Sequence, residues 1–401
     1  MNVQKIKMLS EQYKVELLDN IVPFWLNKSQ DKECGGYFSC LTREGDVFDN
    51  DKFVWLQARQ VWLFAMLCNK VDKKQEWLDA SVQGAEFLKK FGHDGKLNWY
   101  FSLTKEGKPI IEPYNIFSYT FASMAFGQLS KATGNEEYAN IAISTFENIL
   151  LKANNPKGKW NKSCPETRNL KNFALPMILC NLALEIEHLL DKSVLDETIE
   201  KCIHEVMEVF YRPELGLVVE NLNAEDNSLS DTFEGRLINP GHAIEAMWFI
   251  MDLGSRLNRP ILIEKASNIA LQMIEYGWDN KYGGIFYFMD RKGNPPQQLE
   301  WNQKLWWVHI ETLIATLKAY QLTRSQESLK WFLKVQEYAW THFKDEQHPE
   351  WYGYLDRRGE VLLPLKGGKW KGCFHVPRGM YQCWKTLEKI DCEITTKKQI
   401  Q

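Results

Sequence analysis

Two histidines of this 401-residue chain stand where helices are expected to begin, which suits them to proton transfer. His242 follows Asn239 and Pro240, residue types that are preferred at the N-cap and at the first position of a helix. The positive end of the helix dipole is expected to lower the pKa of His242, leaving a neutral imidazole that can act as a base. Glu245 lies one turn further along the same face and is expected to orient the ring.

His375 has a similar setting, with Pro377 beside the expected helix start and Arg378 three residues away. A neighbouring cation favours the neutral form of an imidazole, and it can also stabilise an oxyanion. A lone histidine near a helix start is most often a capping or packing residue, so the inference depends on the equivalent positions of His242 and His375. Two such histidines suit removal of a proton next to a carbonyl and its return.

Two further charged residues lie inside apolar segments, where an unpaired charge is costly to bury. Arg59 lies in the apolar run 53–62, and Glu311 lies in the expected helix 305–317. Arg59 is expected to meet a carboxylate or a ligand oxygen, and a purely structural ion pair between Arg59 and Glu311 is the alternative. His309 precedes Glu311 by two residues, roughly 200° around a helix, so we favour Glu311 as the catalytic group and His309 as a substrate contact.

The elements that must position these residues recur along the chain. Three plain units each place a turn-rich stretch before an apolar helix, and three weaker units do the same. The plain units join 35–38 to 55–59, 283–286 to 306–311, and 352–355 to 374–378; the weaker units join 95–100 to 115–117, 158–161 to 172–174, and 216–220 to 239–242. Second helices with charged faces lie between these points. Six helix pairs that close on themselves predict an all-α fold, an (α/α)6 barrel with short β-hairpins on one rim.

Composition narrows the class of protein. Charged residues make up 25% and hydrophobic residues 44%, as in soluble globular proteins, and no linker divides residues 1–401, so one catalytic domain is expected. The net charge of −3 and scattered basic residues argue against a nucleic-acid or membrane partner. With no signal peptide or membrane-spanning run, a cytoplasmic location is expected. The absence of GxGxxG, P-loop, HExxH, GxSxG and zinc-ligand spacings predicts no metal and no required cofactor.

Several longer segments resemble the N-acylglucosamine 2-epimerase family. They are 35–38, 54–62, 239–246, 298–301, 304–309 and 371–378, and the resemblance extends from about Trp25 to Leu387. It implies an (α/α)6 barrel, often a homodimer, that interconverts N-acetyl-D-glucosamine and N-acetyl-D-mannosamine through deprotonation and reprotonation at C2 of the open-chain sugar. ATP activates parts of the family, but no motif in this chain supports or excludes nucleotide activation.

The resemblance also implies which residues do the chemistry. Carried over motif by motif, the catalytic set is Arg59, His242, Glu311, His375 and Arg378, the positions that the residues alone had indicated. The expected substrate contacts are Glu245, Trp306, His309 and Asn172.

Two alternatives remain on the same barrel, cellobiose 2-epimerase and a mannose-type aldose–ketose isomerase. The cellobiose enzymes tend to have Glu and Gln where Leu305 and His309 stand, so this segment resembles the N-acyl branch more closely. Val308, where that branch commonly has proline, and the segment 167–172 depart from it. From other classes, an inverting glycosidase would use Glu311 with Glu234, and a noncatalytic sugar-binding protein would have no use for two such histidines.

Overall fold

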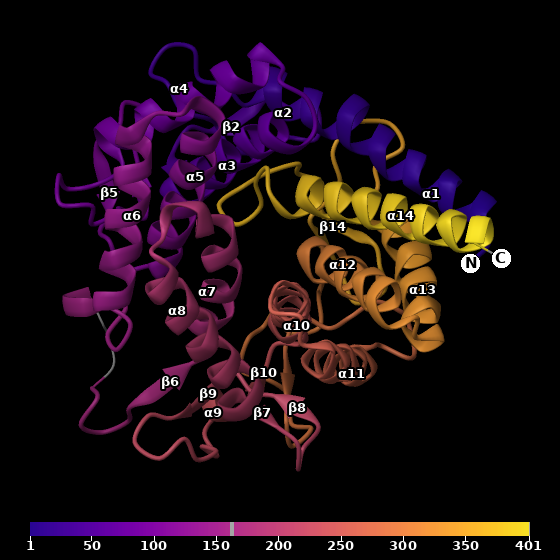
Figure 1. Ribbon diagram of the computed structural model, residues 1–401. Coiled ribbons are helices and arrows are strands. Elements are labelled where there is room, and N and C mark those ends of the chain that lie inside the picture. Colours follow the sequence, from indigo (N-terminus) through magenta and orange to yellow (C-terminus); the bar gives the residue numbers. More distant parts are fainter. Residues whose placement is uncertain (161–163, 401) are drawn as a thin grey trace.

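The computed structural model describes residues 1–160 and 164–400, and its helices form an inner and an outer ring (Figure 1). The inner helices are α3 (Val54–Lys70), α5 (Ile116–Thr133), α7 (Ala174–Glu185), α10 (Pro240–Arg256), α12 (Trp306–Thr323) and α14 (His375–Ile400). Their outer partners, in the same order, are α4 (Gln75–Phe91), α6 (Glu136–Leu151), α8 (Lys192–His204), α11 (Pro260–Gly277), α13 (Gln326–His342) and α1 (Val3–Val15). The predicted (α/α)6 barrel is confirmed, and its sixth pair joins the two ends of the chain (Figure 1).

Helix composition explains which helices are inner and which are outer. Every residue of α3 from Val54 to Cys68 is buried, as expected for a helix that is apolar around its whole circumference. In contrast, α4 buries residues at spacings of three and four, such as Trp77, Ala80 and Gly84, and therefore has one apolar face. None of the helices in the described part of the chain combines the length and apolarity needed to cross a membrane.

Short antiparallel strands fill the segments that precede the inner helices. They are β1 (Cys40–Leu41), β2 (Val47–Asp49), β3 (Lys52–Phe53), β4 (Ser102–Leu103), β5 (Pro109–Ile111), β6 (Leu170–Asn172), β7 (Tyr211–Arg212), β8 (Leu217–Val218), β9 (Asn221–Asn223), β10 (Leu237–Ile238), β11 (Met289–Asp290), β12 (Lys304–Leu305), β13 (Tyr354–Leu355) and β14 (Val361–Leu363). They pair in sheets of two or three strands, as the predicted rim hairpins require. Two short α-helices, α2 (Val22–Lys28) and α9 (Phe233–Arg236), lie outside the two rings.

A buried aspartate–lysine pair recurs in three of the turns that lead from an outer helix back toward the barrel. The Asp–Lys pairs are Asp31–Lys52, Asp279–Lys304 and Asp345–Lys366, at 2.7, 3.2 and 2.8 Å. In each turn the aspartate also accepts a backbone N–H from the residue two positions further on, and the lysine donates to a backbone carbonyl of the turn. A buried pair with these additional hydrogen bonds fixes the turn to the segment that precedes the next inner helix.

The last Asp–Lys pair closes the ring. Arg43, at the tip of the hairpin β1–β2, donates through Nε to Oδ2 of Asp345 at 2.7 Å, so the first unit of the chain binds the last. Burial alone would raise the pKa of Asp345, but its hydrogen bonds with Arg43 and Lys366 outweigh burial and hold the pKa below its usual range. Thr42 and Leu365 form a β-bridge beside this contact.

We predict that Asp345→Ala lowers the free energy of unfolding by about 3–5 kcal/mol, because Lys366 is then left buried without its counter-charge. Urea unfolding followed by circular dichroism measures this. The control Glu44→Ala, on the exposed side of the same hairpin, should change the value by less than about 0.5 kcal/mol. Equal effects of the two substitutions would contradict the role given to the Asp–Lys pair.

Candidate active site

The five predicted catalytic residues come from the first two turns of four inner helices and meet in the barrel. Arg59 is on α3, His242 on α10, Glu311 on α12, and His375 and Arg378 are on α14. The side chain of Asn239 caps α10 by accepting a hydrogen bond from the backbone N–H of His242 at 3.2 Å, as the sequence predicts. The rim hairpins precede these helices, and they determine where each inner helix begins.

A buried guanidinium connects two carboxylates at the centre of the site. Arg378 donates to Oε1 of Glu311 at 2.8 Å and also to Oε1 of Glu245. Trp248 donates through Nε1 to the other oxygen of Glu311 at 2.9 Å. Burial alone would lower the pKa of Arg378, but the charges of Glu311 and Glu245 outweigh burial and raise that pKa. Both carboxylates therefore share one permanently charged partner.

His375 is held by Glu311 and remains neutral. Its Nδ1 lies 2.7 Å from Oε1 of Glu311, which accepts a hydrogen bond and so places the imidazole proton on Nδ1. Burial lowers the pKa of His375 well below its ordinary value, and the charges of Arg59 and Arg378 lower it further. The pKa of His375 is thus shifted in the direction that the sequence predicted, toward the neutral imidazole. Nε2, which has no hydrogen bond within the described residues, then carries the lone pair that a base requires.

His242 differs from the prediction in both its partner and the direction of its pKa shift. Its Nδ1 lies 3.1 and 3.2 Å from the two oxygens of Glu220, whereas Glu245 binds Arg378 instead. Burial lowers the pKa of His242, but the charge and hydrogen bond of Glu220, with the charge of Glu245, outweigh burial and raise it. The expected lowering by the helix dipole is therefore wrong, because a carboxylate in contact exerts the stronger field.

Glu220 is the main residue that the sequence analysis missed. It lies in the segment between β8 and β9, is 6% exposed, and accepts the backbone N–H of Phe173 through its carbonyl at 2.9 Å. The available signal was a charge at the end of the apolar run 217–219, the same signal that identified Arg59. No helical spacing relates Glu220 to His242, because the two residues are brought together by separate elements.

Arg59 does not form the ion pair with Glu311 that was one alternative. Its guanidinium lies over three aromatic rings, with centroids at 4.4 Å for Trp55, 4.0 Å for Phe121 and 4.5 Å for Phe374. No ion pair of Arg59 is formed within the described residues, and its buried Nε lacks a hydrogen-bond partner there. Burial and then the charge of Arg378 lower its pKa well below the ordinary value. Its charge is therefore available to a ligand oxygen.

Two adjacent tryptophans at the start of α12 lie against the histidines. Trp307 contacts both imidazoles, with centroid distances of 5.4 Å to His242 and 5.8 Å to His375. Trp306, predicted as a substrate contact, lies 6.3 Å from the ring of His375, and its buried Nε1 has no partner among the described residues. Trp307 was not predicted, and it is the residue that links the two histidines in space.

His309 does not reach the site, so its prediction as a substrate contact is wrong. The ring is fully buried, Nε2 accepts the backbone N–H of Ile285 at 3.0 Å, and Nδ1 donates to the carbonyl of Leu305 at 2.7 Å. Burial lowers its pKa to about 3. Both nitrogens are thus used to attach the turn containing Ile285 to α12.

Asn172 is exposed at the end of β6, beside the start of α7. Its Oδ1 accepts the backbone N–H of Ala174, and its Nδ2 donates to Oδ1 of Asn221, both at 2.9 Å. These contacts order the segment next to Glu220, whose carbonyl also accepts from Nδ2 at 3.3 Å. A substrate contact for Asn172 stays a prediction.

The carboxylate pair considered for glycoside hydrolysis is not formed as that reaction requires. Both oxygens of Glu311 are engaged by Arg378, His375 and Trp248. Glu234 lies exposed on α9 and forms an ion pair with Arg168 at 3.3 Å. An inverting glycosidase needs one free acid and one free base flanking the sugar.

Ligand atoms of Glu245, Glu311 and His375 lie within 4.8 Å of one another, a spacing that a metal ion also accepts. Here the guanidinium of Arg378 already supplies a positive charge to both carboxylates. A second cation at the same place would meet electrostatic repulsion. The expectation that no metal is bound stays a prediction.

Comparison with known proteins identifies the family. A family model described as N-acylglucosamine 2-epimerase (GlcNAc 2-epimerase) matches residues 36–377. The chain belongs to this family. It is 37% identical over 384 residues to the N-acylglucosamine 2-epimerase of Bos taurus, covering 93% of this chain and 90% of that protein. It is 23% identical to the cellobiose 2-epimerase of Dictyoglomus turgidum, covering 96% and 100% of the two chains.

The fold of this epimerase-family protein is also found in solved structures. The cellobiose 2-epimerase of Spirochaeta thermophila DSM 6192 superposes with a TM-score of 0.81 at 19% identity, covering 96% of this chain and 98% of that chain. At that identity the similarity establishes the barrel, and the chemistry must be argued from the residues.

We predict that Glu220→Gln lowers the pKa of His242, because the charge that outweighs burial is removed while the ring stays buried. A pH titration of ¹⁵N-labelled histidine by NMR measures this, with the signal assigned through His242→Asn. Glu234→Gln, which neutralises an exposed carboxylate, is the control and should leave the His242 signal unchanged. A His242 pKa that is unchanged in Glu220→Gln would show that Glu220 does not set it.

Proposed function

We propose that this protein interconverts N-acetyl-D-glucosamine and N-acetyl-D-mannosamine by inverting C2 of the open-chain sugar. The observation that carries the proposal is the arrangement of His242 and His375, which contact one tryptophan ring, Trp307, and are each held through Nδ1 by a separate carboxylate. Each Nε2 is left without a partner among the described residues. Epimerisation by proton transfer on two faces of one carbon needs two such groups.

The charge states of the two histidines suit removal of the C2 proton by one of them and return of a proton by the other. The C1 aldehyde of the open chain makes the C2 proton acidic, and neutral His375 takes that proton on Nε2 to leave an enolate across C1 and C2. His242, whose raised pKa keeps it protonated to a higher pH than an ordinary histidine, gives a proton to the opposite face of C2. The product has the inverted configuration, and the two histidines have exchanged charge states. The reverse reaction begins from that exchanged state.

Arg59 is the cation suited to the negative charge that develops on O1. Its guanidinium has no ion-pair partner within the described residues, whereas Arg378 is committed to Glu245 and Glu311. An aimed cation in a site that excludes water contributes several kcal/mol to the stability of such a transition state. The nitrogen on C2 disfavours tautomerisation to a ketose, so return of the proton to C2 is the preferred outcome.

The family resemblance supports an N-acyl sugar over the alternatives. The curated relatives named N-acylglucosamine 2-epimerase are 36–37% identical to this chain, whereas those named cellobiose 2-epimerase are 22–23% identical. Side-by-side assays of N-acetylmannosamine, mannose and cellobiose separate the three candidate activities. Turnover of mannose or cellobiose at a higher kcat/KM than N-acetylmannosamine would favour an alternative.

In D₂O, we predict that N-acetylmannosamine gives a product carrying deuterium at C2, because the returned proton comes from a histidine that exchanges with solvent. NMR of the reaction measures this directly. His242→Asn and His375→Asn should each lower kcat for epimerisation by about 10²–10⁴-fold, since each removes an acid or base. Each variant retains one histidine and should therefore still exchange deuterium into a single epimer.

The control for these variants is His204→Asn, which replaces an exposed histidine on the outer helix α8 and should retain full activity. Circular dichroism confirms that each variant is folded. Normal epimerisation by both His242→Asn and His375→Asn would rule out the two-histidine mechanism.

We predict a bell-shaped dependence of kcat/KM on pH. The acidic limb lies at low pH because His375 must be neutral and its pKa is lowered, and the alkaline limb lies above the ordinary histidine range because His242 must be protonated. Glu220→Gln removes the charge that raises the pKa of His242, so its alkaline limb should move to lower pH. An acidic limb that moves instead would assign the base to His242.

A further inference from the structure

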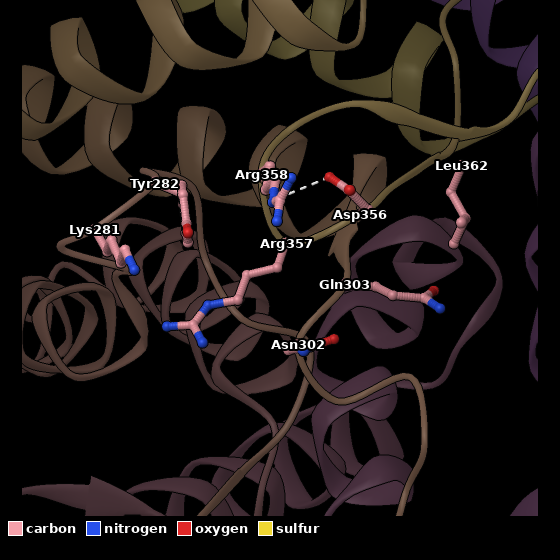
Figure 2. A pocket seen from close by; sticks show the side chains of 8 residues that line it. All are labelled: Lys281, Tyr282, Asn302, Gln303, Asp356, Arg357, Arg358 and Leu362. Atoms are coloured by element: carbon pink, nitrogen blue, oxygen red, sulfur yellow. Dashed lines mark hydrogen bonds between the residues drawn. The ribbon is translucent and has the colours of Figure 1, made fainter.

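A polar pocket of about 460 Å³ lies outside the set of residues described above (Figure 2). Its wall combines three basic side chains and one acidic side chain with amide and apolar groups, and a volume of this size accommodates a small ligand. The lining residues are Lys281, Tyr282, Asn302, Gln303, Asp356, Arg357, Arg358 and Leu362. They come from the turn that holds Asp279, from the segment before β12, and from the hairpin β13–β14.

The internal repeat provides two reference copies of this wall. In each copy a hairpin tip lies on a turn that contains an Asp–Lys pair, and the second residue of the tip is a cation. These cations are Lys105, Arg43 and Arg357, on the turns of Asp31, Asp345 and Asp279 respectively. The three tips share the same backbone hydrogen bonds between their first and fourth residues. The copies are therefore comparable position by position.

In two of the three copies, the residue two positions after the aspartate binds the tip cation; the exception is the pocket copy, where Asp279 alone among the described residues forms a hydrogen bond with Arg357. Two residues after the aspartate stands Glu33 in one copy, whose carboxylate binds Lys105 at 2.5 Å. In the next copy Gln347 stands there and accepts from Arg43 at 3.1 Å. In the pocket copy the same position is Lys281, a cation that cannot accept a hydrogen bond from Arg357.

The third residue of the hairpin tip reverses its charge in the same copy. It is Glu106 or Glu44 in the reference copies and Arg358 in the pocket copy. Neither Lys281 nor Arg358 forms an ion pair within the described part of the chain. The two departures together replace acidic or amide groups with cations. Both cations, Lys281 and Arg358, line the same pocket (Figure 2).

The remaining groups of the pocket favour an anion with several oxygens. Arg357 is fixed by its Nε hydrogen bond to Asp279 at 3.0 Å, which leaves its other guanidinium N–H groups for a ligand. Oδ1 of Asp356 is occupied by the backbone N–H groups of Arg358 and Glu360, at 2.8 and 3.0 Å. The side-chain amides of Asn302 and Gln303 make no hydrogen bond to the described residues. Cations and amide donors at fixed positions are typical of phosphate recognition.

We propose that this pocket binds a phosphate monoester of a small molecule. The phosphate oxygens are bound by Arg357, Arg358 and Lys281, and the amides of Asn302 and Gln303 supply further donors. The ring of Tyr282 and the side chain of Leu362 line the same pocket and provide apolar surface for the organic part of the ester. A hexose phosphate and a nucleoside monophosphate share this chemistry.

Isothermal titration calorimetry at low ionic strength tests the proposal with glucose 6-phosphate, adenosine 5′-monophosphate and inorganic phosphate, using unphosphorylated glucose and adenosine as blanks. We expect saturable binding of at least one ester, and the ester that binds more tightly identifies the source. Lys281→Glu, which installs the residue of the Glu33 position, should weaken that binding by at least about tenfold, because an attraction becomes a repulsion. Arg358→Glu should act in the same direction.

The matched control is Lys32→Glu, which makes the same change of charge on an exposed residue of the turn that contains Asp31. It should leave the dissociation constant unchanged. The proposal is overturned if neither ester binds, if only inorganic phosphate binds, if Lys281→Glu binds the ester as tightly as the parent protein, or if Lys32→Glu weakens binding equally.

Discussion

The site depends on one buried guanidinium shared by two carboxylates. Without Arg378, Glu245 and Glu311 would be two buried carboxylates with no shared counter-charge, which is a costly arrangement. With Arg378 in place, Glu311 accepts a hydrogen bond from Nδ1 of His375, which fixes both the tautomer and the orientation of that ring. Because Arg378 and His375 share α14 while Glu311 is on α12, the packing of these two inner helices sets the geometry of the base.

The charged groups around the site also shift the pKa values of the two histidines in opposite directions. His375 lies near two guanidinium groups, Arg59 and Arg378, and burial and these charges together favour its neutral form. His242 is held by Glu220, which forms no ion pair with Lys or Arg within the described residues, and its imidazolium is favoured. One barrel thus keeps a base and an acid within contact of the same tryptophan ring. Separation of two pKa values by environment is how enzymes assign acid and base roles to similar groups.

The barrel and most of the site could be predicted from the sequence because they leave local patterns. Apolar periodicity and repeated turns indicated the six helix pairs, and Arg59 and Glu311 were recognisable as charges inside apolar helices. Glu220 and Trp307 were not predicted, since their roles depend on contacts between elements distant in sequence. His309 shows the opposite error, because a polar residue on an inner helix can face the backbone of a neighbouring turn instead of the cavity. The repeat builds the scaffold, and its chemical features arise where single copies depart from it.

We infer that the two histidines rest in opposite charge states, and neutron diffraction tests this by locating their hydrogens. In a crystal of the ligand-free protein at about pH 6, below the ordinary histidine pKa of about 6.5, most exposed histidines are protonated. We expect deuterium on both nitrogens of His242 and on Nδ1 alone of His375. A doubly protonated His375, or a His242 with a single deuterium, would contradict it.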